Sequence, residues 1–314
     1  MKTYMKVLII FATISSFAVA MIFPYIWPYV ENVIGLSAVI SGVLLFTFYG
    51  TEATTRIPIG FLSSIFRHSF IVVGAAISYV VAALFYLSHE WSWLLFFGGQ
   101  VFLGLGISIT WVTIPDFVTR EEGSLPVYTF SVGLGYLGGV TIGGFLVDYV
   151  GMSRLFMVFF WISIVLVVLS LLFQREMTGN AIPKLTEQVK KPVDVEGDSS
   201  EMSIGVSQLF VSSFGSIGDA FEIMRERAKV LISGLVSFLM FMTFAIGSSL
   251  IPVYLSGIGL SSFLIGMLLS IRMGTGTVIR LATDRMLKIG DKVEILTVGT
   301  MLTGLSIVLF TMTE

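Results

Sequence analysis

Residues 175–201, REMTGNAIPKLTEQVKKPVDVEGDSSE, open a charged segment that continues to Lys229 and separates two stacks of apolar segments. Much of the chain's charge lies in it, although charged residues make up only 12% of the 314 residues and hydrophobic residues 55%. A soluble chain of this length needs more charge to cover its surface. The pattern therefore predicts a membrane protein in three parts: a bundle at 1–174, a cytoplasmic linker at 175–229 and a second bundle at 230–314.

The apolar segments on both sides of the linker are long enough to cross a bilayer as helices. A spanning helix needs about 20 mostly apolar residues, and backbone amides in lipid must pair within their own segment. We therefore expect an all-α fold with six helices before the linker and three after it. The predicted helices cover residues 6–29, 36–57, 69–88, 92–116, 127–148, 154–174, 230–255, 261–282 and 293–312.

The lysines and arginines between these helices indicate their orientation. With the N-terminus in the cytoplasm, most of them fall on the cytoplasmic side, as is typical of multi-pass membrane proteins. They include Lys2, Lys6, Arg67, Arg120 and the cations of the linker. We expect a protein of the cell membrane with a cytoplasmic N-terminus and with residue 314 outside.

The composition excludes several kinds of function. The chain has no cysteine, which excludes disulfides, thiol catalysis and cysteine metal sites. His68 and His89 are far apart and predict no metal site. No paired intramembrane acids, His-Glu-x-x-His motif or serine–lysine arrangement is present. We therefore expect neither an enzyme nor a protein with a cofactor or a nucleic-acid partner.

The two stacks begin with similar sequences. A shift of 224 residues places Ile34-Gly35-Leu36-Ser37 on Ile258-Gly259-Leu260-Ser261, and Arg56 on Arg280. The match continues without a gap over the first two helices of each stack. The second stack is therefore interpreted as an incomplete parallel repeat of the first. In transporters built from such repeats, the substrate lies between the halves near the middle of the membrane.

This organisation resembles the major facilitator superfamily over essentially the whole chain. The family's loop after helix two reads Gly-x-x-x-Asp-Arg-x-Gly-Arg-Arg, and the segment from Gly60 to Arg67 fits that frame with Ser64 at the aspartate position. The copy after helix eight keeps Asp284-Arg285. The resemblance implies that this loop pairs charges between helix ends and latches one conformation. The alternative is a polar loop that only holds a helix pair.

Two further patterns resemble exporters of this family. Gln100-x-x-x-Gly104 fits their Arg-x-x-x-Gly motif in helix four, with glutamine in place of arginine. Gln100 is a candidate for binding substrate or a neighbouring helix. In helix five, Gly135, Gly139 and Gly143 lie four residues apart and share one face. That spacing favours close helix packing. The alternative, which the resemblance implies, is that these glycines form a hinge, as in the family's exporters.

Charges within predicted spans mark candidate transport residues, because they are costly in lipid. Arg272 lies 11 residues after Ser261, about 16 Å along a helix in a core roughly 30 Å thick. It is predicted to contact an anionic or zwitterionic substrate or to take part in coupling, the alternative being a structural ion pair. Glu52, four residues before Arg56, is interpreted as an ion-pair partner or a proton-binding group. Trp111 is predicted either to line the substrate cavity between the two stacks or to pack between helices.

Together these features predict a secondary active transporter that moves a small organic solute by alternating access. Coupling to protons or another ion is left open, and the glycines of helix five slightly favour efflux. The alternative is a truncated, non-transporting fragment or a membrane-embedded partner protein. The lipid bilayer, the transported solute and a second chain that completes the bundle are the candidate partners.

Overall fold

The computed structural model describes residues 2–121, 123–188, 246–286 and 301, and every regular element within them is helical. This confirms the all-α fold. The helices are α1 (Thr3–Asn32), α2 (Ala38–Ile65), α3 (His68–Leu87), α4 (Leu95–Arg120), α5 (Leu125–Val150), α6 (Met152–Gln188), α9 (Ile251–Gly257) and α10 (Ser262–Met286). A short 3-10 turn, Ser88–Glu90, follows α3, and a π-turn, Ile246–Leu250, precedes α9.

The predicted helices of the first stack correspond in order to α1 through α6, and the eighth predicted helix corresponds to α10. Two helices run well past their predicted ends, α2 to Ile65 and α6 to Gln188. The linker was predicted to begin at residue 175, but α6 continues to Gln188. The residues just beyond the apolar run include good helix formers, so the helix does not end where the apolar run ends. The rest of the linker, the start of helix seven and the ninth predicted helix, 293–312, lie outside the described residues.

Helices α1, α3, α4, α5 and α6 are long and apolar enough to cross a membrane. Helix α2 does not reach that apolarity, because it carries Glu52, Arg56 and several serines and threonines. In α10 the apolar stretch is shorter and covers Ser262–Thr275. The two less apolar helices are thus the ones that carry the charged candidates Glu52 and Arg272.

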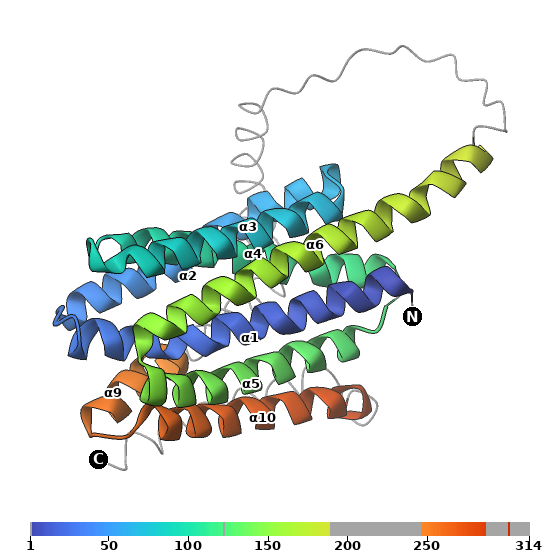
Figure 1. Ribbon diagram of the computed structural model, residues 1–314. Helices are drawn as coiled ribbons and strands as arrows, with labels where there is room; N and C mark the ends of the chain where they lie inside the picture. The colour runs from blue at the N-terminus through green and yellow to red at the C-terminus, as the bar shows by residue number, and fades with distance from the viewer. Residues whose placement is uncertain (1, 122, 189–245, 287–300, 302–314) are drawn as a thin grey trace, which may run out of the picture.

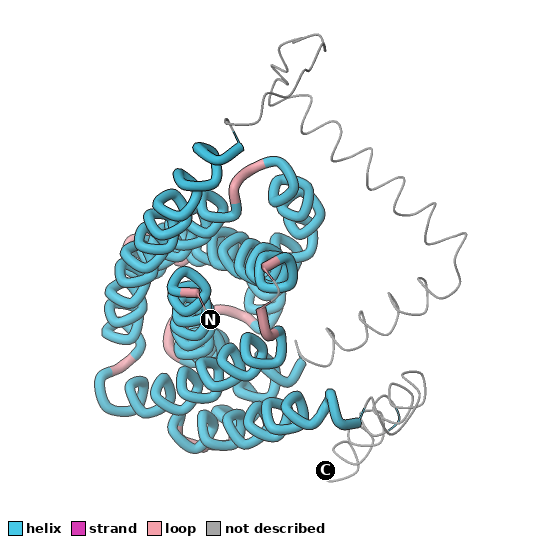
Figure 2. The backbone as a smooth tube through the Cα atoms, turned by 90° about the vertical axis from the view of Figure 1, so that its right-hand side faces the viewer, coloured by secondary structure: helices cyan, strands magenta, loops and turns pink. Residues whose placement is uncertain are grey.

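The helices form a single bundle around α1 (Figure 1). Helix α1 packs along α5 and α6, α3 packs against α4 and α6, and α2 packs against α4. Helix α10 packs along α5 and so joins the second stack to the first. Figure 2 views the helices end-on, with the N-terminus at the near end.

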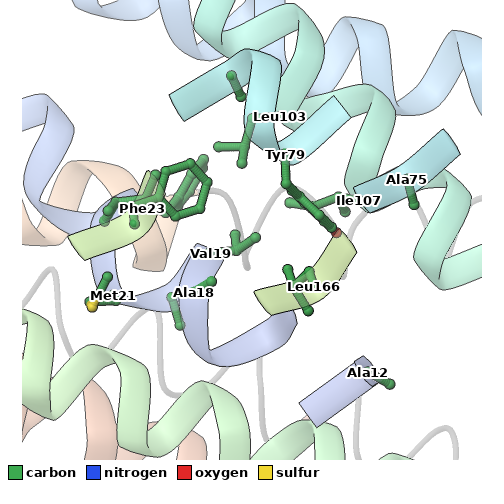
Figure 3. Close-up of a cluster of buried hydrophobic side chains, with 14 of the residues drawn as sticks. Ala12, Ala18, Val19, Met21, Phe23, Ala75, Tyr79, Leu103, Ile107 and Leu166 are labelled. Carbon is green, nitrogen blue, oxygen red and sulfur yellow. The ribbon is translucent and has the colours of Figure 1, made fainter. Parts of the chain in front are cut away.

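Buried side chains of α1, α3, α4 and α6 meet in the centre of the first stack, among them Val19, Tyr79 and Leu166 (Figure 3). Lipid is as apolar as these side chains, so hydrogen bonds and close packing select the helix partners. The hydroxyl oxygens of Tyr79 and Thr110 lie 3.0 Å apart between α3 and α4. A Cβ on Gly106 would lie 2.8 Å from the Tyr79 ring, so this pairing requires a glycine there.

Glycines on one face of α5 bring it against the backbone of α1. A Cβ added to any of them would overlap a carbonyl oxygen of α1, so the two helices touch backbone to backbone. The pairs are Gly135 with Thr13, Gly139 with Phe17, and Gly143 with Met21. These are the three glycines that the sequence places on one face, and α1 is the helix they meet.

Candidate functional site

Polar side chains gather where α2, α5, α10 and the π-turn meet. Tyr49 and Glu52 come from α2, Tyr136 from α5 and Arg272 from α10. The Tyr49 hydroxyl oxygen lies 3.2 Å from the Ser248 hydroxyl oxygen of the π-turn. Arg272 interacts electrostatically with both tyrosines, and so does Glu52. An acid of the first stack and an arginine of the second are thus both near enough to the two tyrosines to act on them electrostatically.

The spacing along α2 explains its contribution to this cluster. Tyr49, Glu52 and Arg56 lie three and four residues apart and therefore share one side of the helix. Glu52 is only 5% exposed and forms an ion pair with Arg56, as its spacing predicts. A buried carboxylate is strongly destabilising without a partner, so Arg56 makes its position tolerable.

The π-turn supplies the wall of the cluster that comes from the second stack. Gly247 lies directly against the Arg272 guanidinium, and a Cβ there would overlap that group. Ser248 contacts Tyr49 and is 1% exposed. Pro252 follows in the first turn of α9, where its missing N–H is tolerated. Turns of π-helix inside α-helices occur frequently at functional sites.

A second set of contacts ties the stacks together at the end of the bundle where α1 and α5 finish, called the α9 end here (Figure 1). The Asp148 carboxylate at the end of α5 accepts hydrogen bonds from the backbone N–H groups of Ser262, at 2.9 Å, and Phe263, at 2.8 Å. A carboxylate at a helix N-terminus is favourable. Nearby, the Asn32 side-chain amide donates to the Ser256 hydroxyl at 3.1 Å.

The opposite end of the bundle carries ion pairs within the first stack. Asp116 at the end of α4 accepts a hydrogen bond from Arg120 at 2.9 Å, and its other oxygen lies 3.0 Å from His68 Nε2 at the start of α3. Lys2 pairs with Glu121 at 3.0 Å. These contacts fix the ends of helices within one stack and do not join the two stacks.

Gln100 and Trp111, the two uncharged candidates, lie elsewhere on α4. Gln100 is completely buried, and its amide has no hydrogen-bond partner among the described residues. Gly104, in the same motif, marks the close approach of α4 to α2, because a Cβ there would lie 2.7 Å from the Phe48 carbonyl oxygen. Trp111 is 42% exposed and thus not packed within the described bundle.

The residues of the proposed latch motif are spread over two helix ends. Gly60 lies inside the last turns of α2 rather than in a loop, and Arg67 is the exposed residue just before α3. Asp284 and Arg285 lie near the end of α10, and their side chains are outside the described part of the structure. The latch therefore stays a prediction.

Five residues of these contacts carry no signal in the sequence alone: Tyr49, Tyr136, Gly247, Ser248 and Asp148. Tyrosines and small residues are common in membrane helices, so their type gave no signal. Of these residues, Tyr49 could most easily have been predicted, because it lies one helical turn before Glu52. Within the described residues, no group of three histidines or acids is placed to hold a metal ion.

The sequence was compared with protein-family models and with curated proteins. The model of the Major Facilitator Superfamily matches residues 8–314. That match covers both stacks and the linker between them. None of the curated proteins compared with the chain matches it.

Proposed function

The chain belongs to the major facilitator superfamily, whose members are membrane transporters, and on this premise we propose that it moves a small organic anion by alternating access. The observation that carries the proposal is the position of Arg272, on α10 of the second stack and beside Tyr49 and Tyr136 of the first. A charge within a membrane helix is costly and marks function.

The chemistry of this cluster suits an oxyanion. A guanidinium presents its N–H donors in a planar fork that matches a carboxylate. The hydroxyls of Tyr49 and Tyr136 offer further donors beside it. Because the arginine and the tyrosines belong to different stacks, rocking of one stack against the other would assemble the site and take it apart. We propose this as the way in which binding is linked to alternating access.

Two structural details support the inference that the second stack repeats the first. Gly35 and Gly259, which the shift of 224 residues aligns, both have positive φ, at 77° and 88°. Asn32 and Ser256 are aligned by the same shift and hydrogen bond to each other. Equivalent positions that touch each other lie close to the axis relating two repeats. We propose that this axis runs between α1 and α9.

The orientation proposed from the charges fits this arrangement. Lys2, Arg67 and Arg120 lie toward the end of the bundle where α1 begins, which would face the cytoplasm. The α9 end would then face outside. In this orientation the Asp148 and Asn32 contacts close the outer side between the stacks.

Replacing Arg272 with alanine tests the anion site. In proteoliposomes loaded or challenged with radiolabelled acetate, benzoate, succinate or glucose, we expect the unchanged protein to transport at least one of the anions. Arg272→Ala should lower the rate about tenfold or more, because hydrogen bonds to charged groups contribute about 1.5–3 kcal/mol. Comparing uptake with efflux gives the preferred direction.

Arg154→Ala is the matched control, since Arg154 is an exposed arginine at the start of α6. It should transport at the unchanged rate, and Arg272→Lys should keep part of the activity because it keeps the charge. Equal anion transport by Arg272→Ala and the unchanged protein would refute the proposed site.

Glu52 is the proposed coupling group. It is buried beside Arg56 and interacts electrostatically with the same tyrosines as Arg272. Proton uptake by its carboxylate would therefore break the ion pair with Arg56 and alter the charge around the site. We expect Glu52→Gln to lose anion accumulation driven by a pH gradient at least tenfold while keeping anion exchange at equal pH. A variant that still follows the pH gradient would exclude Glu52 as the coupling group.

A further inference from the structure

Within the second stack, Gly247 of the π-turn lies very close to the Arg272 side chain of α10. A Cβ built on Gly247 would overlap Nη1, Cζ and Nη2 of the guanidinium. The guanidinium therefore lies against the bare backbone of the π-turn. All three atoms belong to the end of one flexible side chain, so a side chain at position 247 would displace the guanidinium as a whole.

Neighbouring residues of the π-turn and α9 fix the position of Gly247. Ser248, the next residue, is 1% exposed and contacts Tyr49 of α2, while Pro252 begins the following helix. The same turn thus touches the arginine through one residue and the first stack through the next. Glycine destabilises a helix relative to alanine by about 1 kcal/mol, and at this position its missing side chain leaves room for the guanidinium.

We propose that Gly247 is a positioning residue that fixes the Arg272 guanidinium and thereby sets which anions the site accepts. A side chain at position 247 would push the guanidinium away from the π-turn. Recognition of a carboxylate by a planar fork depends on the position and angle of that fork. Displacement should therefore weaken anion binding without removing the charge. This inference rests on the proposed anion site for its transport effect, but the contact itself can be tested without any substrate.

The position of the guanidinium can be measured with phenylglyoxal, a reagent for arginine side chains. Its reaction with Arg272 in the purified, detergent-solubilised protein is followed by mass spectrometry of the peptide that contains this residue. We expect Gly247→Ala to raise the rate at Arg272 at least threefold. Gly74→Ala is the matched control, because a Cβ on Gly74 of α3 would meet nothing within 4 Å. An unchanged rate in Gly247→Ala would overturn the proposal.

A double-mutant cycle covers the case in which Gly247→Ala destabilises the protein. The drop in melting temperature caused by Gly247→Ala is measured once with Arg272 present and once in Arg272→Ala. If the guanidinium is what the new methyl group meets, most of the drop should disappear in the second background. A drop of equal size in both backgrounds would show that the methyl group collides with something else, and the proposal would be wrong.

Transport gives the functional readout. In Gly247→Ala we expect the KM for benzoate or succinate to rise at least tenfold, while the maximal rate per folded transporter stays within about twofold. A purely structural role would lower the amount of folded transporter and leave KM unchanged, and that result would refute a positioning role. If the unchanged protein transports neither anion, the proposed function fails, whereas the phenylglyoxal rate and the cycle still decide whether Gly247 positions Arg272.

Discussion

Replacing Gly139 with valine is expected to separate α1 from α5 and to leave little folded protein. A Cβ at this position would overlap the Phe17 carbonyl oxygen and lie 3.0 Å from the Ala20 Cβ. A backbone carbonyl in a helix cannot rotate away as a side chain can, so the two helices must move apart along their length. Overpacking of this kind destabilises proteins by about 1–3 kcal/mol or more. Size-exclusion chromatography of a fluorescent fusion measures the loss.

The neighbouring glycine provides a matched control on the same helix. A Cβ on Gly138 would meet the Phe17 ring at 3.6 Å, an ordinary contact with a side chain that can adjust. Gly138→Val should therefore give a monodisperse peak close to that of the unchanged protein. If Gly139→Val and Gly138→Val elute and melt alike, α1 and α5 do not touch backbone to backbone and the arrangement of the first stack is wrong.

The sequence predicted the glycine face of α5 but not its partner. A spacing of four residues places three glycines on one side of any helix, whereas the helix they meet depends on how the whole bundle folds. The same limit applies to helix ends. An apolar run marks the part of a helix that lipid requires. Helix α6 continues beyond its run through Arg175, Glu176 and Met177, which favour a helix, and then past Gly179 and Pro183, which do not.

The candidate site was partly predictable for a similar reason. Charges are rare in apolar helices, so Arg272 and Glu52 stood out. Tyr136 did not, because tyrosine is an ordinary residue of membrane helices. Gly247 and its π-turn were also missed, since glycines and serines such as those of Ile246–Leu250 are ordinary residues of membrane helices. What makes them special is the guanidinium that packs against them from another helix.

Removing the Asp148 carboxylate is expected to open the α9 end of the bundle. Asp148 belongs to the first stack, but both of its oxygens accept hydrogen bonds from the first turn of α10 in the second. Any motion that parts the stacks at this end must break both bonds. A carboxylate at an exposed helix N-terminus contributes about 0.3–1 kcal/mol. Because 1 kcal/mol changes a two-state ratio about fivefold, Asp148→Ala should favour the open form by up to about fivefold.

A cysteine introduced by Ser270→Cys reports this opening, because the chain has no cysteine of its own. Ser270 is 8% exposed and lies between α5 and α10, with its hydroxyl oxygen 2.6 Å from that of Thr141. A membrane-impermeant maleimide added from outside should label it about twofold to fivefold faster in Asp148→Ala.

The control is Glu31→Ala, which removes a carboxylate from the same end of the bundle. Glu31 has no ion pair or hydrogen bond from its side chain among the described residues, so its loss should leave the labelling rate unchanged. Faster labelling in Asp148→Ala alone would show that losing the hydrogen bonds from the first turn of α10 to Asp148 causes the opening. Equal acceleration in both variants would instead point to a general effect of charge at this surface. No acceleration in Asp148→Ala would mean that other contacts hold the two stacks together there.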